Sequence, residues 1–297
     1  MTEQHHHDAD STPANLRLAF VLNLGFTLLE IVGGFWTNSV AILADAVHDL
    51  GDSLSLGLAW YLESYAERVA DPGYSYGYRR FSMLGALINS IVLIAGSIWV
   101  LASAIPRLLA PESVQAGGMI VLALVGIGVN GLAVFRLHRN QSLNAQVVGW
   151  HLLEDVLGWI AVLIVSILLL FTDWTILDPI LSILVTLFVL ANVVRKLRRT
   201  GRLFLQGVPP NVNMKALEHR ILDVEPIQAV HHMHLWSLDG EHHVFTAHVV
   251  LPADTSKAEA SQIKRQLVDA INTDEMEHMT IEIEFGEDDC RLDIASG

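Results

Sequence analysis

The 297-residue chain is 52% hydrophobic and only 17% charged, which excludes an ordinary soluble domain of this length and is typical of a membrane protein. Its single cysteine excludes a fold held together by internal disulfides. The net charge of −14 is concentrated from Leu203 onward, where 17 Asp and Glu outnumber 6 Lys and Arg, so this part should repel nucleic acid and attract cations.

Six segments are long and apolar enough to cross the roughly 30 Å hydrocarbon core of a bilayer as helices. They cover residues 14–36, 39–62, 80–105, 117–137, 146–171 and 175–194. The polar, acidic start MTEQHHHDAD lacks the basic region of a secretory signal, so we expect the first segment to be retained. Basic residues gather in the loops of one side, so the positive-inside rule places both termini in the cytoplasm. We expect a multi-pass protein of the inner (plasma) membrane.

After Phe204 the pattern becomes that of a small soluble domain. A helical stretch NMKALEHRILDV is followed by the alternating strands IQAVHHMHLWSL and EHHVFTAHVVL, the helix SKAEASQIKRQLVDAIN and the strand HMTIEIEF. The order α-β-β-α-β predicts a two-layer ferredoxin-like fold. We therefore expect an N-terminal tail (1–13), a six-helix transmembrane domain (14–202), a cytoplasmic α+β ferredoxin-like domain (203–290) and a C-terminal tail (291–297).

The second and fifth apolar segments each carry a histidine and an aspartate at i and i+4, a spacing that puts both side chains on one helix face. These residues are His48 and Asp52 in ADAVHDLGD, and His151 and Asp155 in GWHLLEDVLGWI. Two imidazoles and two carboxylates suit tetrahedral zinc, and ionisable groups at bilayer depth, which cost about 2.5 to 3.5 kcal/mol each, normally mark ion pathways. The alternative is that they only satisfy one another as interhelical hydrogen bonds. Flanking acids are Asp45, Asp49 and Glu154.

Other polar residues in the spans have simpler interpretations. Asn23 and Glu30 share a helix face and could line the ion route, although an interhelical hydrogen bond explains Asn23 equally well. Asp178 stands before a proline and is expected to cap the last membrane helix. Asn89 and Asn130 are expected to be packing contacts beside nearby glycines.

The dipeptide at 239–240, Asp-Gly, predicts a two-residue hairpin turn between the first two strands of the soluble domain. In the resulting register His231 lies directly opposite His248, with about 5 Å between their Cβ atoms. This geometry predicts either a metal site or an ordinary hydrogen-bonded histidine pair, and the choice stays open at this point.

The remaining histidines of the soluble domain are weaker candidates for ligands. One pair should lie on the opposite strand face from His231, as packing or dimer-surface groups first and ligands second, with His234 opposite Phe245. A second pair, near the turn, should be solvated. The two pairs are His232 with His234, and His242 with His243. His278 could join a second metal, and the tail residues 5–8, HHHD, predict at most loose metal binding.

Five ordered stretches resemble the cation diffusion facilitator family, its zinc-exporting bacterial branch in particular. They are NSVAILADAVHDLGDSLSLGLAW, YSYGYRRFSMLGALIN, NAQVVGWHLLEDVLGW, VHHMHLWSLDGEHHVFTAHVVL and MTIEIEF. The resemblance covers nearly the whole chain after residue 14 and implies a homodimeric six-helix transporter that exchanges a cytosolic divalent metal for external protons. By motif position, the implied ligands are His48, Asp52, His151 and Asp155 for transport, and His231, His248 and Glu284 for regulatory metal on the cytoplasmic domain.

Two residues depart from the family pattern. Asp49 stands where an apolar residue often follows the first histidine, and this carboxylate could alter proton coupling or metal choice. Gln206 stands in LFLQGVP where the family usually has an acid, so a charged interlock of this segment with Arg79 is not supported.

The sequence thus predicts a Zn²⁺/H⁺ antiporter that exports cytosolic zinc, with zinc as the transported ion and as a regulatory ligand. The alternatives are an exporter of cadmium, iron(II), manganese or cobalt, and a membrane-anchored metal sensor that transports nothing. Two imidazoles per site favour zinc, and a sensor has no need of ligands inside the bilayer. Neither a G-x-x-x-x-G-K-[ST] phosphate loop nor an H-E-x-x-H helix occurs, so we do not expect an enzyme.

Overall fold

The structure is a computed structural model that describes residues 13–66, 68–137, 143–271, 276–286 and 290, without the side chains of residues 13–19, 59–60, 63–64 and 136–151. The chain forms two compact units. The first comprises Met1–Ser64 and Gly85–Leu197, and the second comprises Tyr65–Leu84 and Arg198–Gly297. The loop between the second and third helices therefore belongs to the same unit as the C-terminal domain.

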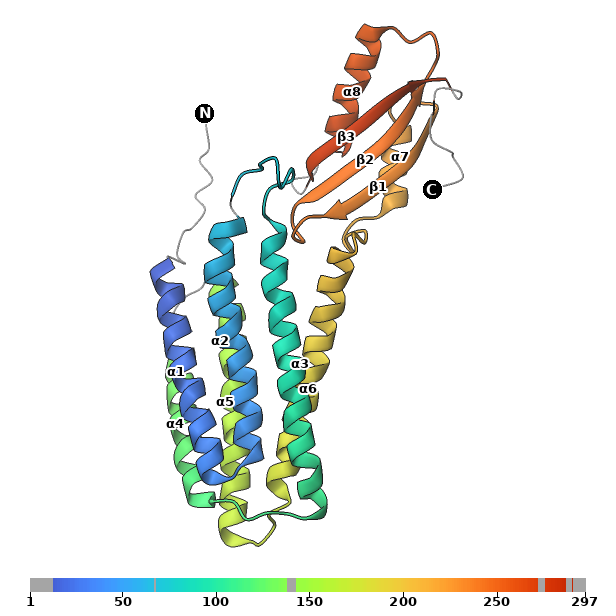
Figure 1. The fold of residues 1–297 in the computed structure, drawn as a ribbon. Helices are drawn as coiled ribbons and strands as arrows, with labels where there is room; N and C mark the ends of the chain where they lie inside the picture. The colour runs from blue at the N-terminus through green and yellow to red at the C-terminus, as the bar shows by residue number, and fades with distance from the viewer. Residues whose placement is uncertain (1–12, 67, 138–142, 272–275, 287–289, 291–297) are drawn as a thin grey trace. The chain divides into compact units, whose positions relative to one another are not determined.

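Six long helices follow the six predicted spans in order (Figure 1). They are α1 (Pro13–Thr37), α2 (Val40–Ala66), α3 (Arg80–Leu109), α4 (Ala116–Leu137), α5 (Leu143–Phe171) and α6 (Leu177–Phe204). Five are long and apolar enough to cross a membrane, and α2 falls short of that test because acidic residues interrupt its apolar sequence. The chain is a multi-pass membrane protein. The main difference from the prediction is that α6 continues to Phe204, so the basic run RKLRRTGR is helical.

The membrane helices approach closely where glycine leaves room for a large neighbour. A Cβ atom on Gly126 of α4 would lie 2.3 Å from Cδ2 of Trp159 on α5, and Trp159 is completely buried. The predicted packing contact of Asn89 is confirmed, because its Nδ2 donates to Oγ of Ser55 on α2 at 2.6 Å. Small residues and short polar bridges thus bring the helices together, as is usual where lipid provides no hydrophobic driving force between them.

Asp178 caps a different helix from the one predicted. It lies in the first turn of α6, but its carboxylate accepts hydrogen bonds from Oγ of Ser39 (2.5 Å) and from the backbone N–H groups of Val40 (2.9 Å) and Ala41 (3.3 Å) at the start of α2. The first N–H groups of a helix lack partners within the helix and carry partial positive charge, so a buried carboxylate satisfies both needs. The prediction that Asp178 caps the last helix is therefore wrong.

The C-terminal part has the predicted α-β-β-α-β order (Figure 1). Its elements are α7 (Met214–Leu222), β1 (Ala229–Ser237), β2 (His243–Leu251), α8 (Lys257–Ile271) and β3 (Met276–Phe285). The strands form one sheet in the order β1-β2-β3, with β1 antiparallel and β3 parallel to β2. The fold expected from the sequence, membrane helices followed by a small α+β domain, is confirmed.

The two faces of this sheet have different roles. Phe245, Ala247 and Val249 of β2 point into an apolar core that α7 and α8 complete, for example through Leu217 and Leu267. Successive residues of a strand point to opposite faces, so the residues between them in β2 face away from the helices. That second face carries His248 and, opposite it on β1, His231.

Candidate metal sites

The membrane helices bring three of the four predicted transport ligands together. Nε2 of His48 lies 3.7 Å from Oδ2 of Asp52, one turn further along α2, and 3.8 Å from Oδ1 of Asp155 on α5. The predicted fourth residue, His151, lies on α5, but its side chain is outside the described part of the chain. Glu154 is exposed, whereas the side chain of Asp155 is only 12% exposed, which favours Asp155 over its neighbour.

Further acids surround this cluster. Asp45, Asp49 and Glu30 are all buried, and Glu30 is completely inaccessible to water. The charged neighbours of Glu30 include Asp45 and Asp49, and its carboxylate interacts directly with that of Asp49. Burying unpaired negative charge is costly, so this region requires protons or other cations to offset its carboxylates.

Asn23 contributes to packing rather than to this charged cluster. Its Nδ2 donates to the backbone oxygen of Asp49 at 3.3 Å and to Oγ of Ser53 at 3.0 Å. Of the two interpretations left open by the sequence, the interhelical hydrogen bond is the one that the structure describes.

On the soluble domain, His231 and His248 pair directly across β1 and β2, as predicted. Their rings are 5.5 Å apart, and Glu284 of β3 lies between them. Oε2 of Glu284 is 3.0 Å from Nε2 of His231, and Oε1 is 2.7 Å from Nδ1 of His248. The carboxylate is buried, and Nε2 of His231 and Oε2 of Glu284 have no other hydrogen-bond partner among the described residues. Two imidazoles and a carboxylate whose atoms point at one another fit a divalent metal such as zinc.

The strand register that produces this pair differs from the predicted register in two ways, a longer turn and a bulge, and their effects on the pairing of His231 cancel. The turn is one residue longer than expected, because the N–H of Leu238 donates to the oxygen of His242 and Asp239 Oδ1 accepts from the N–H groups of Glu241 and His242. A bulge between His231 and His234 then adds one residue to β1 and restores the predicted pairing beyond it.

The longer turn and the bulge each overturn a prediction about a neighbouring histidine. His234 lies opposite Thr246 instead of Phe245. His232 adopts a left-handed backbone conformation (φ 48°), and its ring lies 5.1 Å from the rings of both His231 and His248 rather than on the opposite face. Three imidazoles therefore gather where the sequence predicted two.

Cys290 is the member of this cluster that sequence reasoning missed. One ligand atom from each of His231, His248, Glu284 and Cys290 lies within 4.8 Å of the other three. Cys290 follows the last strand, and no spacing in the sequence connects it to the histidines. The only signal was that the chain has one cysteine and that it is near an acidic strand.

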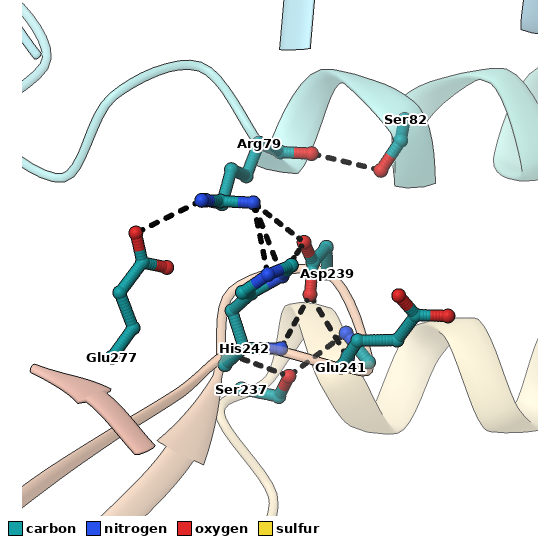
Figure 2. A network of polar contacts seen from close by, with 8 residues as sticks. Arg79, Ser82, Ser237, Asp239, Glu241, His242 and Glu277 are labelled. Atoms are coloured by element: carbon teal, nitrogen blue, oxygen red, sulfur yellow. Dashed lines mark hydrogen bonds and ion pairs between the residues drawn. The ribbon is translucent and has the colours of Figure 1, made fainter. Parts of the chain in front are cut away.

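A second polar network joins the 65–84 loop to the sheet within the same unit (Figure 2). Arg79 donates to Oε1 of Glu277 at 2.9 Å and approaches Oδ2 of Asp239 at 3.9 Å and the ring of His242 at 3.1 Å. His242 is also 2.6 Å from Asp239, so it is part of this network and not simply solvated as predicted. Arg79 thus finds acidic partners on the strands, although Gln206 replaces the acid expected after α6.

Hydrogen bonding sets the charge of Asp239 in this network. Burial alone would raise its pKa, but hydrogen bonds from the backbone of His242 and Glu241 and from the His242 side chain outweigh burial and hold the pKa below its usual value. Asp239 is therefore a carboxylate at neutral pH and a suitable partner for Arg79.

Two further histidines lie within strands of the soluble domain. His243 is completely buried at the start of β2, so the prediction that it is solvated is wrong. His278 lies inside β3 and packs edge-on against Tyr76 of the 65–84 loop, with 5.2 Å between the ring centres. The N-terminal residues 5–8 lie outside the described part of the chain.

Comparison with known proteins identifies both parts of the chain. Residues 16–205 match the cation efflux transmembrane domain, and residues 209–285 match the cation efflux protein cytoplasmic domain. The chain is 34% identical over 295 residues to the zinc transporter ZitB of Escherichia coli, covering 96% of this chain and 93% of the relative.

Two further relatives are of similar length. The cadmium, cobalt and zinc/H⁺-K⁺ antiporter of Bacillus velezensis is 31% identical over 288 residues, covering 96% of this chain and 92% of the relative. The metal cation efflux system protein CzcD of Cupriavidus metallidurans is 31% identical over 286 residues, covering 95% and 90%. The chain therefore belongs to the cation efflux, or cation diffusion facilitator, family.

Proposed function

We propose that this protein exports divalent metal ions, zinc foremost, from the cytosol in exchange for protons. The observation that carries the proposal is the position of His48 between Asp52 of its own helix and Asp155 of another. A mixed imidazole and carboxylate set favours zinc over magnesium and calcium, which prefer oxygen ligands alone. The names of the relatives, which include zinc transporters and antiporters, support the same substrate class.

We propose His151 as the fourth transport ligand. It precedes Asp155 by one helical turn on α5, just as His48 precedes Asp52 on α2. The proposal rests on this repeated spacing and on the family motif. It completes a pair of imidazoles and a pair of carboxylates, which neutralises the charge of one divalent ion.

Proton exchange follows from the chemistry of the same ligands. A metal ion and a proton compete for the same lone pairs, so metal binding requires deprotonated ligands. Imidazole titrates close to neutral pH, which makes His48 and His151 suitable coupling groups. Protons arriving from the outside would displace the metal and restore the site for the next cycle.

The orientation, assembly and regulation of the protein also belong to this proposal. Both termini lie in the cytoplasm of a cell whose inner membrane the helices cross, which the basic run of α6 supports. Two copies assemble into a homodimer, as the family resemblance implies. His231, His248 and Glu284 hold a regulatory metal that reports the cytosolic concentration.

The test is zinc uptake into inside-out vesicles. Asp155→Asn should lower the transport rate by at least about 100-fold, the upper end of the loss seen when even indirect contacts to a metal ligand are removed. Glu154→Gln is the matched control, because this adjacent acid on the same helix is exposed. Equal rates for parent and Asp155→Asn would overturn the proposal, as would uptake indifferent to an imposed pH gradient.

A membrane-anchored metal sensor is the second candidate, and the cluster at Glu284 is the observation that favours it. A sensor would bind metal on the soluble domain and carry no flux. Metal binding without any zinc uptake by the parent protein would therefore establish the sensor in place of the exporter.

A further inference from the structure

We propose that Cys290 is the fourth ligand of a complete metal site within one protomer, together with His231, His248 and Glu284, and that its sulfur makes this site select zinc and cadmium over harder divalent ions. The inference deepens the proposed regulatory site and rests on metal binding there. It adds a ligand, a selectivity and a stoichiometry of one ion per chain.

The distances fit a tetrahedral site after small side-chain movements. All four ligand atoms lie within 4.8 Å of one another. A tetrahedral zinc ion with bond lengths of about 2.0 to 2.3 Å separates its ligands by about 3.3 to 3.8 Å. The longest separation must therefore shorten by about 1 Å, and the Glu284 contacts to His231 (3.0 Å) and His248 (2.7 Å) must lengthen by less than that, which rotation of side chains can supply without moving the sheet.

The sheet explains how three of these ligands are fixed. His231 and His248 pair across β1 and β2, and Glu284 projects from β3 on the same face of the sheet. The bulge in β1 is what allows His231 to stay opposite His248 after the longer turn. Ligands on regular strands are held more firmly than ligands on loops.

The residue that follows β3 is fixed by its backbone conformation and by a hydrogen bond to β2. Gly286 follows β3 with φ 90°, a conformation that glycine adopts readily and other residues rarely adopt. Its N–H donates to the carbonyl oxygen of Leu251 at 3.0 Å, which attaches the end of β3 to the end of β2. Cys290 is the next described residue, and it is partly buried beside Glu284.

Thiolate ligation sets the metal preference. Sulfur is a soft ligand that favours zinc and cadmium, whereas manganese and magnesium prefer oxygen. Three ligands without Cys290 would leave an open coordination position, as in catalytic zinc sites, and four ligands close the site, as in structural ones. Because all four come from one chain, binding does not require a ligand from a second copy.

Cadmium titration of the full-length protein in detergent tests the inference directly. Cadmium bound to a thiolate absorbs in the ultraviolet, and the chain has one cysteine, so any such absorption belongs to Cys290. We expect the band to saturate at one ion per chain in the parent and to be absent in Cys290→Ser, with at least about tenfold weaker cadmium binding in the variant.

The controls separate this inference from the proposed function. Cadmium bound through His231, His248 and Glu284 without the band would overturn the role of Cys290 and leave the regulatory site intact. A band that persists in the double variant His231→Ala, His248→Ala would place the thiolate at another site and also overturn it. No cadmium bound to the soluble domain of the parent would remove the regulatory site itself, whereas zinc uptake into vesicles tests export separately.

Alkylation of the parent provides a second measurement that does not depend on a variant. One equivalent of zinc per chain should protect Cys290 from iodoacetamide, and manganese at the same concentration should not. Equal protection by the two ions, or none by zinc, would contradict the proposed selectivity.

Discussion

The two histidine-acid clusters differ in how firmly their groups are held. Around His48 the nitrogen-to-oxygen separations are 3.7 and 3.8 Å, and the groups come from separate helices. Around Glu284 the corresponding separations are 3.0 and 2.7 Å, and the groups come from one sheet. A transport site must release its ion on the far side, whereas a regulatory site must retain it. The backbone that holds the ligands, separate helices in one cluster and one sheet in the other, therefore suits each cluster to its proposed task as much as the ligand type does.

The clusters also differ in charge balance. The membrane cluster has buried acids in excess, with Glu30, Asp45 and Asp49 around the predicted ligands. The cluster on the sheet has one buried carboxylate, Glu284, beside two imidazoles. Excess acidic groups favour cations in the first region, whereas the single carboxylate of the second region is already paired with two imidazoles.

Glu284→Gln is expected to have the largest effect on one cluster, the metal site of the soluble domain, without an effect on the other. It should weaken metal binding to the soluble domain by about 10- to 100-fold, because it removes the buried anionic ligand. Zinc transport at saturating zinc should stay close to the parental rate. Glu218→Gln, an exposed acid on α7, which covers the opposite face of the sheet, is the control. If Glu284→Gln lowered the transport rate as much as Asp155→Asn does, the two clusters would not act independently.

A smaller effect is expected in the membrane helices for Asp178→Asn. The change removes negative charge from a buried group that accepts three hydrogen bonds at the start of α2, so the free energy of unfolding should fall by about 1 to 3 kcal/mol. Unfolding in detergent with increasing denaturing surfactant measures it. The exposed Asp173→Asn should have no effect, and a stability change shared by both variants would argue against the cap.

The smallest effect is expected for Arg79→Gln on the second unit. The Arg79 side chain is 36% exposed, and ion pairs of this kind contribute about 0 to 1 kcal/mol. The neighbouring Arg80→Gln is the control. Thermal unfolding in detergent should detect a loss specific to Arg79, and identical melting of the two variants would show that the network is not stabilising.

The pH dependence of this network has a definite sign. The folded state holds the pKa of Asp239 below the value of about 3.9 expected in the unfolded chain, so its contribution to stability is present at neutral pH. It is lost as the pH falls below about 4 and the carboxylate is protonated. Thermal unfolding between neutral pH and about pH 3 should show a smaller acid-dependent loss in Asp239→Asn than in the parent.

Much of the fold was predictable because it depends on local patterns. The six apolar segments of the sequence coincide with the six long helices, although α2 is not among the five described helices that are apolar enough to span a membrane, and strand alternation predicted the order of the soluble domain. The pairing of His231 with His248 was also predicted, but through a register that was wrong near the turn. The reason is that Oδ1 of Asp239 accepts hydrogen bonds from the backbone N–H groups of Glu241 and His242, in a turn that is one residue longer than predicted. The bulge in β1 then compensates for the extra residue.

The features that sequence reasoning missed depend on contacts between distant residues. Asp178 lies before a proline and resembles a local cap, yet it satisfies a helix more than a hundred residues earlier. Arg79 and Cys290 reach their partners only after the sheet has formed. Local propensity and local spacing do not predict contacts between residues that are far apart in the sequence. The i, i+4 spacing of His48 and Asp52, by contrast, is visible in the sequence itself.

The 65–84 loop has one consequence for how the two parts of the protein communicate. It folds with the soluble domain, and it is covalently continuous with α2 and α3, the first of which carries His48. The chain therefore passes between the two units three times, between residues 64 and 65, 84 and 85, and 197 and 198. A metal ion bound at the proposed regulatory site would thus have a covalent route to α2, the helix that carries His48.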